Sequence, residues 1–157
     1  MVESKSKKIL IAADHAGIEM KAYLKRELAF LDWEDLGPSG STPVDYPDFA
    51  EKLAKKVAAG HAAFGVLICG SGIGMCIAAN KTLGIRAAAC DNLFSAKVSR
   101  EHNDCNVLCL GSRIIANAYA TEITKTFLTT EFSGTTRHIQ RVQKITLMET
   151  HLIPDAE

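Results

Sequence analysis

Short apolar runs alternate along the chain with longer segments whose apolar residues recur at helical spacing. Residues 9–13 and 64–69 are apolar almost throughout, which is typical of strands buried on both faces of a parallel sheet. Between them, Met20, Leu24 and Leu28 recur every four residues, which indicates an amphipathic helix. The same pattern predicts strands at 9–13, 33–36, 64–69, 85–90 and 107–110, and helices at 18–31, 45–59, 75–80, 92–102, 114–128 and 135–150.

Strands that alternate with helices predict an α/β fold, here a Rossmann-like three-layer α/β/α sandwich around a five-stranded parallel sheet. The chain has 157 residues, the size of one compact domain, and shows no internal repeat or linker. We therefore interpret residues 1–157 as a single domain, with a frayed tail from His151. In such folds ligands bind beyond the carboxyl ends of the strands.

Composition and charge narrow the class of protein. Lys and Arg together number 18, and Asp and Glu together also number 18, so the formal net charge is zero. Bulk charge therefore does not favour a nucleic-acid or membrane-surface partner. The five cysteines lie mostly in apolar runs, which favours a reducing compartment over a secreted disulfide framework. No apolar stretch reaches transmembrane length or forms a signal peptide. We expect a cytoplasmic protein.

A glycine-rich loop follows the third expected strand. Gly70, Gly72 and Gly74 let backbone N–H groups approach an anion, although the spacing fits neither a Walker A motif nor a dinucleotide fingerprint. The loop predicts an oxyanion or phosphate cradle; the alternative is a tight strand-to-helix turn. Cys69 lies at its mouth, where backbone donors favour a lowered thiol pKa and a role as base or nucleophile.

Several other polar residues follow strands or end helices. Arg137 and Arg141 lie four apart on one helical face, and with Arg113 they could clamp a phosphate; the alternative is a solvated face. His102 ends a helix, where it could carry protons or simply suit the helix dipole. We expect no metal site, because His102, Cys105 and Cys109 lack a fourth ligand.

Taken together, these motifs resemble ribose-5-phosphate isomerase type B, in a superfamily that includes galactose-6-phosphate isomerase. The resemblance runs from about Lys8 to Glu149. It implies interconversion of D-ribose 5-phosphate and D-ribulose 5-phosphate in the pentose phosphate pathway, without cofactor or metal. It also implies a homodimer, sometimes a tetramer, with active sites at the subunit interface. The motifs are Asp14–Gly17, Asp45–Pro47, Cys69–Gly74, Ile77–Lys81, Gly84–Ala88, Ser99–Asp104 and Arg137–His138.

The resemblance also assigns roles to residues. Cys69 takes the base position, Ser71 the proton relay, and His102 and Asp14 positions linked to ring opening and hydroxyl binding. The backbone of Gly70, Gly72, Ile73 and Gly74 would face the developing oxyanion. The phosphate-contacting positions are His15, Arg113, Arg137 and Arg141. The remaining pocket positions are Asp45, Tyr46, Asn103 and His138.

The residue at position 75 decides between a cysteine and a glutamate as the catalytic base that the resemblance implies. Some members of this family lack the cysteine and use a glutamate after the glycine loop, but Met75 stands there in this chain and cannot take a proton. Three other functions stay open: a hexose-6-phosphate isomerase, a non-catalytic phosphosugar- or nucleotide-binding module, and a thiol redox sensor. The joint presence of Cys69, His102 and Asp14 favours an enzyme.

Overall fold

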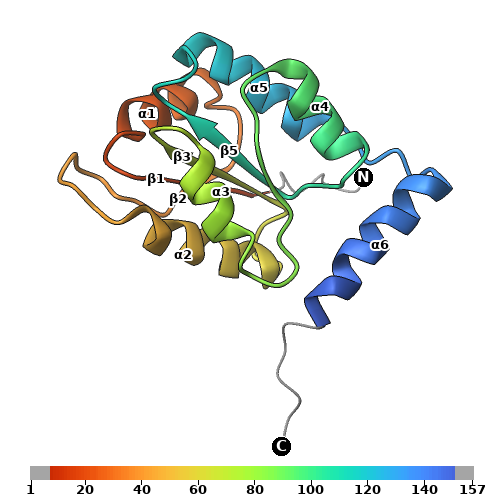
Figure 1. The fold of residues 1–157 in the computed structure, drawn as a ribbon. Helices are drawn as coiled ribbons and strands as arrows, with labels where there is room; N and C mark the ends of the chain where they lie inside the picture. The colour runs from red at the N-terminus through yellow and green to blue at the C-terminus, as the bar shows by residue number, and fades with distance from the viewer. Residues whose placement is uncertain (1–7, 151–157) are drawn as a thin grey trace, which may run out of the picture.

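The computed structural model describes residues 8–150, which form five strands and six helices. In chain order the elements are β1 (Ile9–Ala13), α1 (Ile18–Glu27), β2 (Trp33–Asp35), α2 (Tyr46–Ala58), β3 (Phe64–Cys69), α3 (Ile73–Ala79), β4 (Ala87–Ala89), α4 (Leu93–Glu101), β5 (Val107–Gly111), α5 (Asn117–Thr129) and α6 (Thr136–Thr150). The predicted α/β class with five parallel strands is confirmed (Figure 1).

The strand order determines where a ligand can bind. The sheet runs β2-β1-β3-β5-β4, and every strand pair is parallel. From β1 the chain moves outward to β2, whereas from β3 it moves toward β4 on the opposite side. The carboxyl ends of β1 and β3 therefore border the crevice at which ligands bind in doubly wound sheets.

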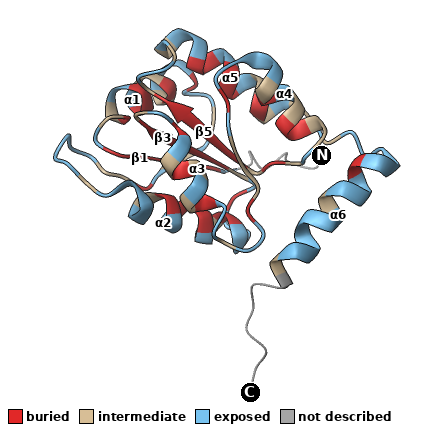
Figure 2. Ribbon diagram, viewed as in Figure 1, coloured by how far each residue is buried: buried red, intermediate tan, exposed pale blue. Residues whose placement is uncertain are grey.

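Two apolar layers hold the sheet between its helices. Side chains of Ile9, Ile11 and Ala13 pack toward α1, α4 and α5, whereas Leu10 and Ala12 pack toward α2 and α3. Figure 2 shows the strands as buried and the outer sides of the covering helices as exposed. Continuous apolar strands are thus explained by burial on both faces.

Helix α6 departs from this layered arrangement. It extends away from the sheet, and only its start is buried (Figures 1 and 2). His138 in the first turn is 4% exposed, whereas Leu147 and Met148 near the other end are more than 60% exposed. The helix thus presents apolar side chains at its surface.

The predicted element boundaries lie within two residues of the structure at all but two ends. The first helix ends at Glu27 rather than residue 31, because the backbone turns at Leu28, whose carbonyl accepts the Trp33 indole N–H at 3.0 Å. The last helix before α6 begins at Asn117, because the N–H groups of Ile114 and Ile115 turn back to the Gly111 carbonyl. The tail from residue 151 lies outside the described residues.

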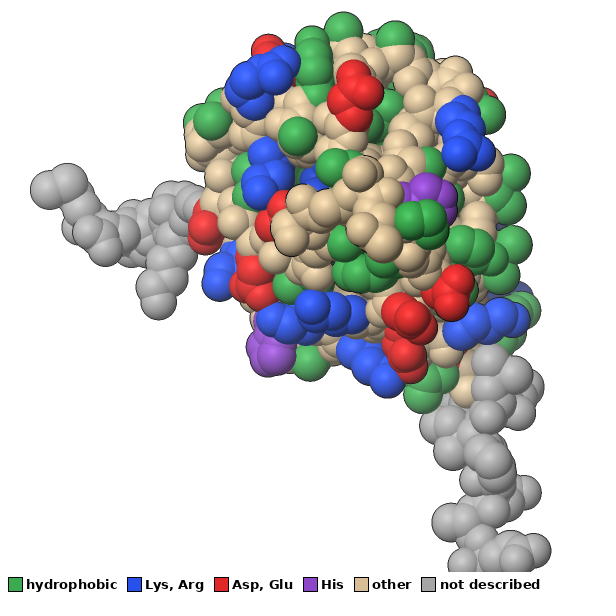
Figure 3. Space-filling view, turned by 90° about the vertical axis from the view of Figure 1, so that its left-hand side faces the viewer, with side chains coloured by type: hydrophobic (Ala, Val, Ile, Leu, Met, Phe, Trp, Pro, Cys, Tyr) green, Lys and Arg blue, Asp and Glu red, His purple; other side chains and the backbone are tan. Residues whose placement is uncertain are grey.

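Neither the helices of the described residues nor the charges on the face in Figure 3 indicate a membrane-spanning segment or a strongly charged protein surface. None of the helices between residues 8 and 150 combines the length and apolar character needed to cross a bilayer. On the face in Figure 3, basic and acidic side chains are interspersed.

Candidate active site

A pocket of about 590 Å³ opens at the carboxyl edge of the sheet, where the ends of β1, β3 and β5 meet the first turns of α2 and α3. It lies at the crevice that the strand order determines. Eight of the predicted site residues line it: Asp14, Tyr46, Cys69, Gly70, Ser71, Ile73, Gly74 and Arg113.

The glycine loop fixes the environment of Cys69. The Gly72 N–H donates to the Cys69 Sγ at 3.1 Å, and the Ile73 N–H donates to the Ser71 Oγ at 3.3 Å. Gly72 has a φ of 77°, and a Cβ there would lie 3.0 Å from the carbonyl carbon of Leu110 in β5. Only glycine allows both the left-handed backbone and this close approach. Cys69, which is 4% exposed as a residue, therefore lies against a fixed loop at the pocket wall.

Tyr46 and Arg113 lie against the same loop. A Cβ at Gly74 would come within 2.7 Å of the Tyr46 ring, so the absence of a side chain there lets the ring rest on the loop. A Cβ at Gly70 would lie 3.3 Å from the Arg113 guanidinium. Two glycines of the loop thus make room for side chains that approach the pocket.

Asp14 is held in a defined orientation beside the thiol. The residue is 7% exposed, and its Oδ1 accepts hydrogen bonds from the N–H groups of Ala16 at 2.9 Å and Gly17 at 3.2 Å. Its own N–H donates to the carbonyl of Ile68, the residue before Cys69. The backbone thus ties the end of β1 to the end of β3.

His15 and Asp45 lie next to pocket residues in the chain but outside the pocket lining. Both are exposed. The Val44 N–H lies 3.5 Å from His15 Nδ1, which links the two loops. Asp45 precedes α2 as its N-cap, yet its carboxylate makes no capping hydrogen bond. Both side chains are therefore available to a ligand that extends from the pocket.

The other five predicted site residues lie at the opposite edge of the sheet: His102, Asn103, Arg137, His138 and Arg141. Helix α4 runs back from the carboxyl edge, and the Asn103 carbonyl accepts the side chain of Arg86, which directly precedes β4. Strand β5 separates the two edges by about 16 Å. One copy of the chain therefore does not bring His102 to Cys69.

Two histidines stack within this second group. The ring centroids of His102 and His138 are 4.3 Å apart, and Ser133 Oγ lies 2.6 Å from His138 Nδ1. The pKa of His138 is lowered, first by burial and second by the charge of nearby His102, so its neutral form is favoured. Ser133, whose N–H donates to the Glu101 carbonyl, was not among the predicted site residues, because a Ser-Gly pair indicates only a loop.

The cysteines outside the pocket differ more than expected. Burial raises the pKa of Cys105 to about 12 and that of Cys109 well above its usual value, as suits packing residues. Cys76 is half-buried, and contact with the Cys109 thiol lowers its pKa to about 7 against the opposing effect of desolvation. The apolar runs in which the cysteines lie therefore do not predict the lowered pKa of Cys76.

The sequence and the fold are also similar to those of known proteins. The model of a family described as Ribose/Galactose Isomerase matches residues 9–145. The chain belongs to this family. A member from Escherichia coli K12, ribose-5-phosphate isomerase B, is 43% identical over 145 residues, which cover 91% of this chain and 97% of that protein.

Solved structures of the ribose/galactose isomerase family share the whole fold. The Clostridium thermocellum ribose-5-phosphate isomerase B has a TM-score of 0.90 and 44% identity, covering 93% of this chain and 99% of that one. The Mycoplasma genitalium enzyme with bound ribulose-5-phosphate has a TM-score of 0.86 and 39% identity, and the match covers 91% of this chain and 96% of that one. The resemblance to type B enzymes is confirmed, and the protein is an isomerase.

Proposed function

We propose that this isomerase interconverts D-ribose 5-phosphate and D-ribulose 5-phosphate through an enediolate, with Cys69 as the base. The observation that carries the proposal is the Cys69 thiol in the pocket wall, held by the Gly72 N–H at 3.1 Å and flanked by Ser71 and Asp14. Met75, the position at which a glutamate could replace the thiol, is fully buried. Among relatives, the Mycoplasma genitalium enzyme carries ribulose-5-phosphate, which supports a pentose phosphate as ligand.

The chemistry divides into ring opening and proton transfer. For ring opening, His102 accepts the proton of the C1 hydroxyl and returns it to O4 as the C1–O4 bond breaks, which leaves an aldehyde. The Cys69 thiolate then removes the C2 proton, and the electron pair moves to O1 to form the enediolate. Backbone N–H groups of the glycine loop stabilise the developing charge, and Ser71 relays the proton between O2 and O1. The Cys69 thiol returns its proton to C1, which yields the ketose.

A second copy of the chain completes the site in this proposal. The pocket holds the base but lacks His102 and the arginines of α6, which lie about one strand length away. Around its rim, Ile73, Ile77 and Ile114 are each more than 50% exposed, as befits a surface that a partner copy covers. A homodimer would bring the His102 group of one copy to the Cys69 group of the other.

Phosphate binding in this proposal falls to cations from both groups. Arg113 approaches the glycine loop from the pocket side, and the exposed Arg137 and Arg141 lie on one face of α6. Guanidinium groups bind phosphate oxygens in pairs, so these three can orient the substrate with C1 and C2 toward Cys69.

Direct turnover by the purified protein tests the proposal. Ketose formation from ribose 5-phosphate is followed in EDTA, with allose 6-phosphate and galactose 6-phosphate in parallel. We expect turnover of the pentose phosphate, and Cys69→Ala should remove most of kcat while sparing substrate binding. Activity on a hexose phosphate alone would change the substrate. Near-normal turnover by Cys69→Ala would show that another group is the base, and a folded but inactive wild-type protein would refute the proposal.

A further inference from the structure

The turn that follows α4, residues 102–106, contains a backbone conformation that its sequence does not favour. Asp104 has a φ of 47°, and among residues 8–150 it alone is a non-glycine residue with a positive φ. Its N–H donates to the Arg100 carbonyl at 3.1 Å, which ends the helix in a left-handed cap. Glycine is the usual residue there, because most side chains crowd the backbone in this conformation. Aspartate and asparagine tolerate it better than other side chains, so the reason for an aspartate here lies in what its carboxylate contacts.

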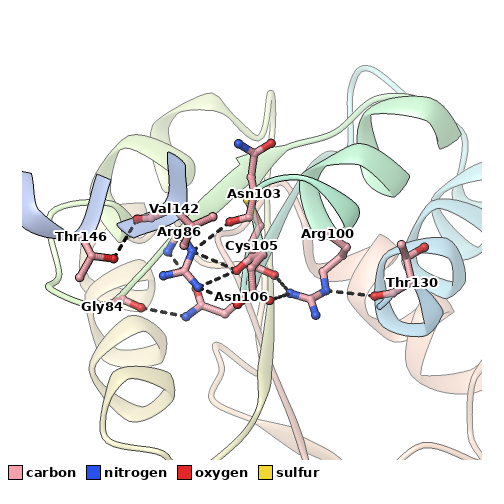
Figure 4. A network of polar contacts seen from close by, with 10 residues as sticks. Gly84, Arg86, Arg100, Asn103, Cys105, Asn106, Thr130, Val142 and Thr146 are labelled. Carbon is pink, nitrogen blue, oxygen red and sulfur yellow. Dashed lines mark hydrogen bonds and ion pairs between the residues drawn. The ribbon is translucent and has the colours of Figure 1, made fainter. Parts of the chain in front are cut away.

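Its carboxylate supplies that reason, because two arginines hold it. Asp104 Oδ1 accepts from Arg100 Nη1 at 2.7 Å, and Oδ2 accepts from Arg86 Nη2 at 3.1 Å. The Arg86 guanidinium also donates to the carbonyl oxygens of Asn103 and Asp104 at 2.8–3.0 Å. Figure 4 shows the two guanidinium groups on either side of the turn. Backbone and side chain of the turn are thus clamped together.

The two arginines are themselves immobilised by the rest of the fold. Arg100 is 7% exposed, lies 4.7 Å from the centroid of the Phe64 ring, and donates to the Cys105 and Thr130 carbonyls. Arg86 leads directly into β4, and its N–H donates to Asn106 Oδ1 at 2.9 Å. The clamp therefore fixes the turn relative to β3, β4 and α5 rather than to α4 alone.

This turn carries two residues of the proposed site. His102 and Asn103 precede Asp104, and Figure 4 shows the Asn103 amide pointing away from the clamp. A displacement of about 1 Å in a catalytic group can cost on the order of a hundredfold in rate. We propose that Asp104 is a positioning residue for the isomerase, which sets His102 and Asn103 through its clamp with Arg86 and Arg100. This inference rests on the proposed function of His102.

The test compares three variants. Asp104→Gly keeps the left-handed backbone and removes the carboxylate, and the milder Asp104→Asn, which tolerates that backbone, serves if the glycine variant does not fold. Glu34→Gln is the matched control, because Glu34 also binds two cations, Lys8 and Lys56, but on edge strand β2. Each is measured for kcat and KM on ribose 5-phosphate and for amide hydrogen exchange, which reports local opening whether or not the protein is active.

We expect both Asp104 variants to lower kcat/KM at least tenfold, mainly through kcat, and to speed amide exchange of residues 104 and 105 at least tenfold. Glu34→Gln should change neither. In a His102→Ala background, Asp104→Asn should cost several-fold less than in wild type, because the two residues act together.

Three results would overturn the clamp: unchanged exchange in the turn, kcat/KM within about twofold of wild type, or an equal loss in both backgrounds. A wild-type protein that does not turn over ribose 5-phosphate would refute the proposed function instead. In that case the exchange measurement alone would decide whether the clamp orders the turn.

Discussion

Gly72→Ala tests whether the loop that holds Cys69 depends on its close approach to β5. The substitution has two costs. A left-handed alanine costs about 1–2 kcal/mol, since Gly72 has a φ of 77°. The new Cβ would also lie 3.0 Å from the Leu110 carbonyl carbon and 3.2 Å from the Gly111 nitrogen. Both atoms belong to the backbone of a central strand, so overpacking adds about 1–3 kcal/mol.

Gly60→Ala is the control, because Gly60 has a φ of 78° but open space around its Cβ position. It should cost only the free energy of the left-handed backbone, which lowers Tm by about 2–8 °C in a domain of this size. Gly72→Ala should lower Tm by about twice as much or more. It should also reduce kcat by about a hundredfold, because the loop amides shift away from the oxyanion. Thermal unfolding and ribose 5-phosphate turnover measure both, and equal behaviour of the two variants would refute the reasoning.

Three further results are expected. Asp35→Asn should destabilise the protein by about 2 kcal/mol at pH 7, because Lys21, whose side chain is 5% exposed, loses its carboxylate partner. Burial opposes the charge of Asp35, but Lys21 and Lys25 outweigh it and lower its pKa. The difference from wild type should therefore persist above about pH 4 and vanish as the pH falls through that lowered pKa, and a pH-independent difference in urea unfolding would contradict it. Alkylation of Cys76 by iodoacetamide, mapped by mass spectrometry, should rise with a midpoint near its pKa of about 7, and a midpoint near that of a free thiol would argue against the Cys109 contact. Arg137→Ala should raise KM for ribose 5-phosphate by about tenfold or more with a smaller effect on kcat, and an unchanged KM would remove Arg137 from the phosphate site.

Local patterns predicted the fold well where one physical cause dominates. Strands 9–13 and 64–69 match β1 and β3 to the residue, because burial on both faces leaves an uninterrupted apolar run. The first helix was predicted too long, because Leu28 and Leu31 continue the apolar spacing after the backbone has turned.

The site was predicted as a set of residues, but its division between two edges of the sheet was not predicted. Alternation of strand and helix already implies that the end of α4, with His102, lies opposite the end of β3, with Cys69. Contacts between side chains of separate helices, strands and loops leave no comparable pattern in the sequence. The approach of Cys76 to Cys109, and that of Ser133 to His138, depend on packing that spacing along the chain does not encode.

Complementation between two severely impaired variants tests most directly whether one site is built from two copies. Cys69→Ala and His102→Ala proteins are each assayed alone, then unfolded together, refolded as a mixture and assayed again with ribose 5-phosphate. Half of the dimers formed at random would be mixed, and each would contain one intact site, so we expect about a quarter of wild-type activity to return. A mixture that stays as inactive as its components, although mixed dimers are detected by native mass spectrometry, would contradict a site shared between Cys69 of one copy and His102 of the other.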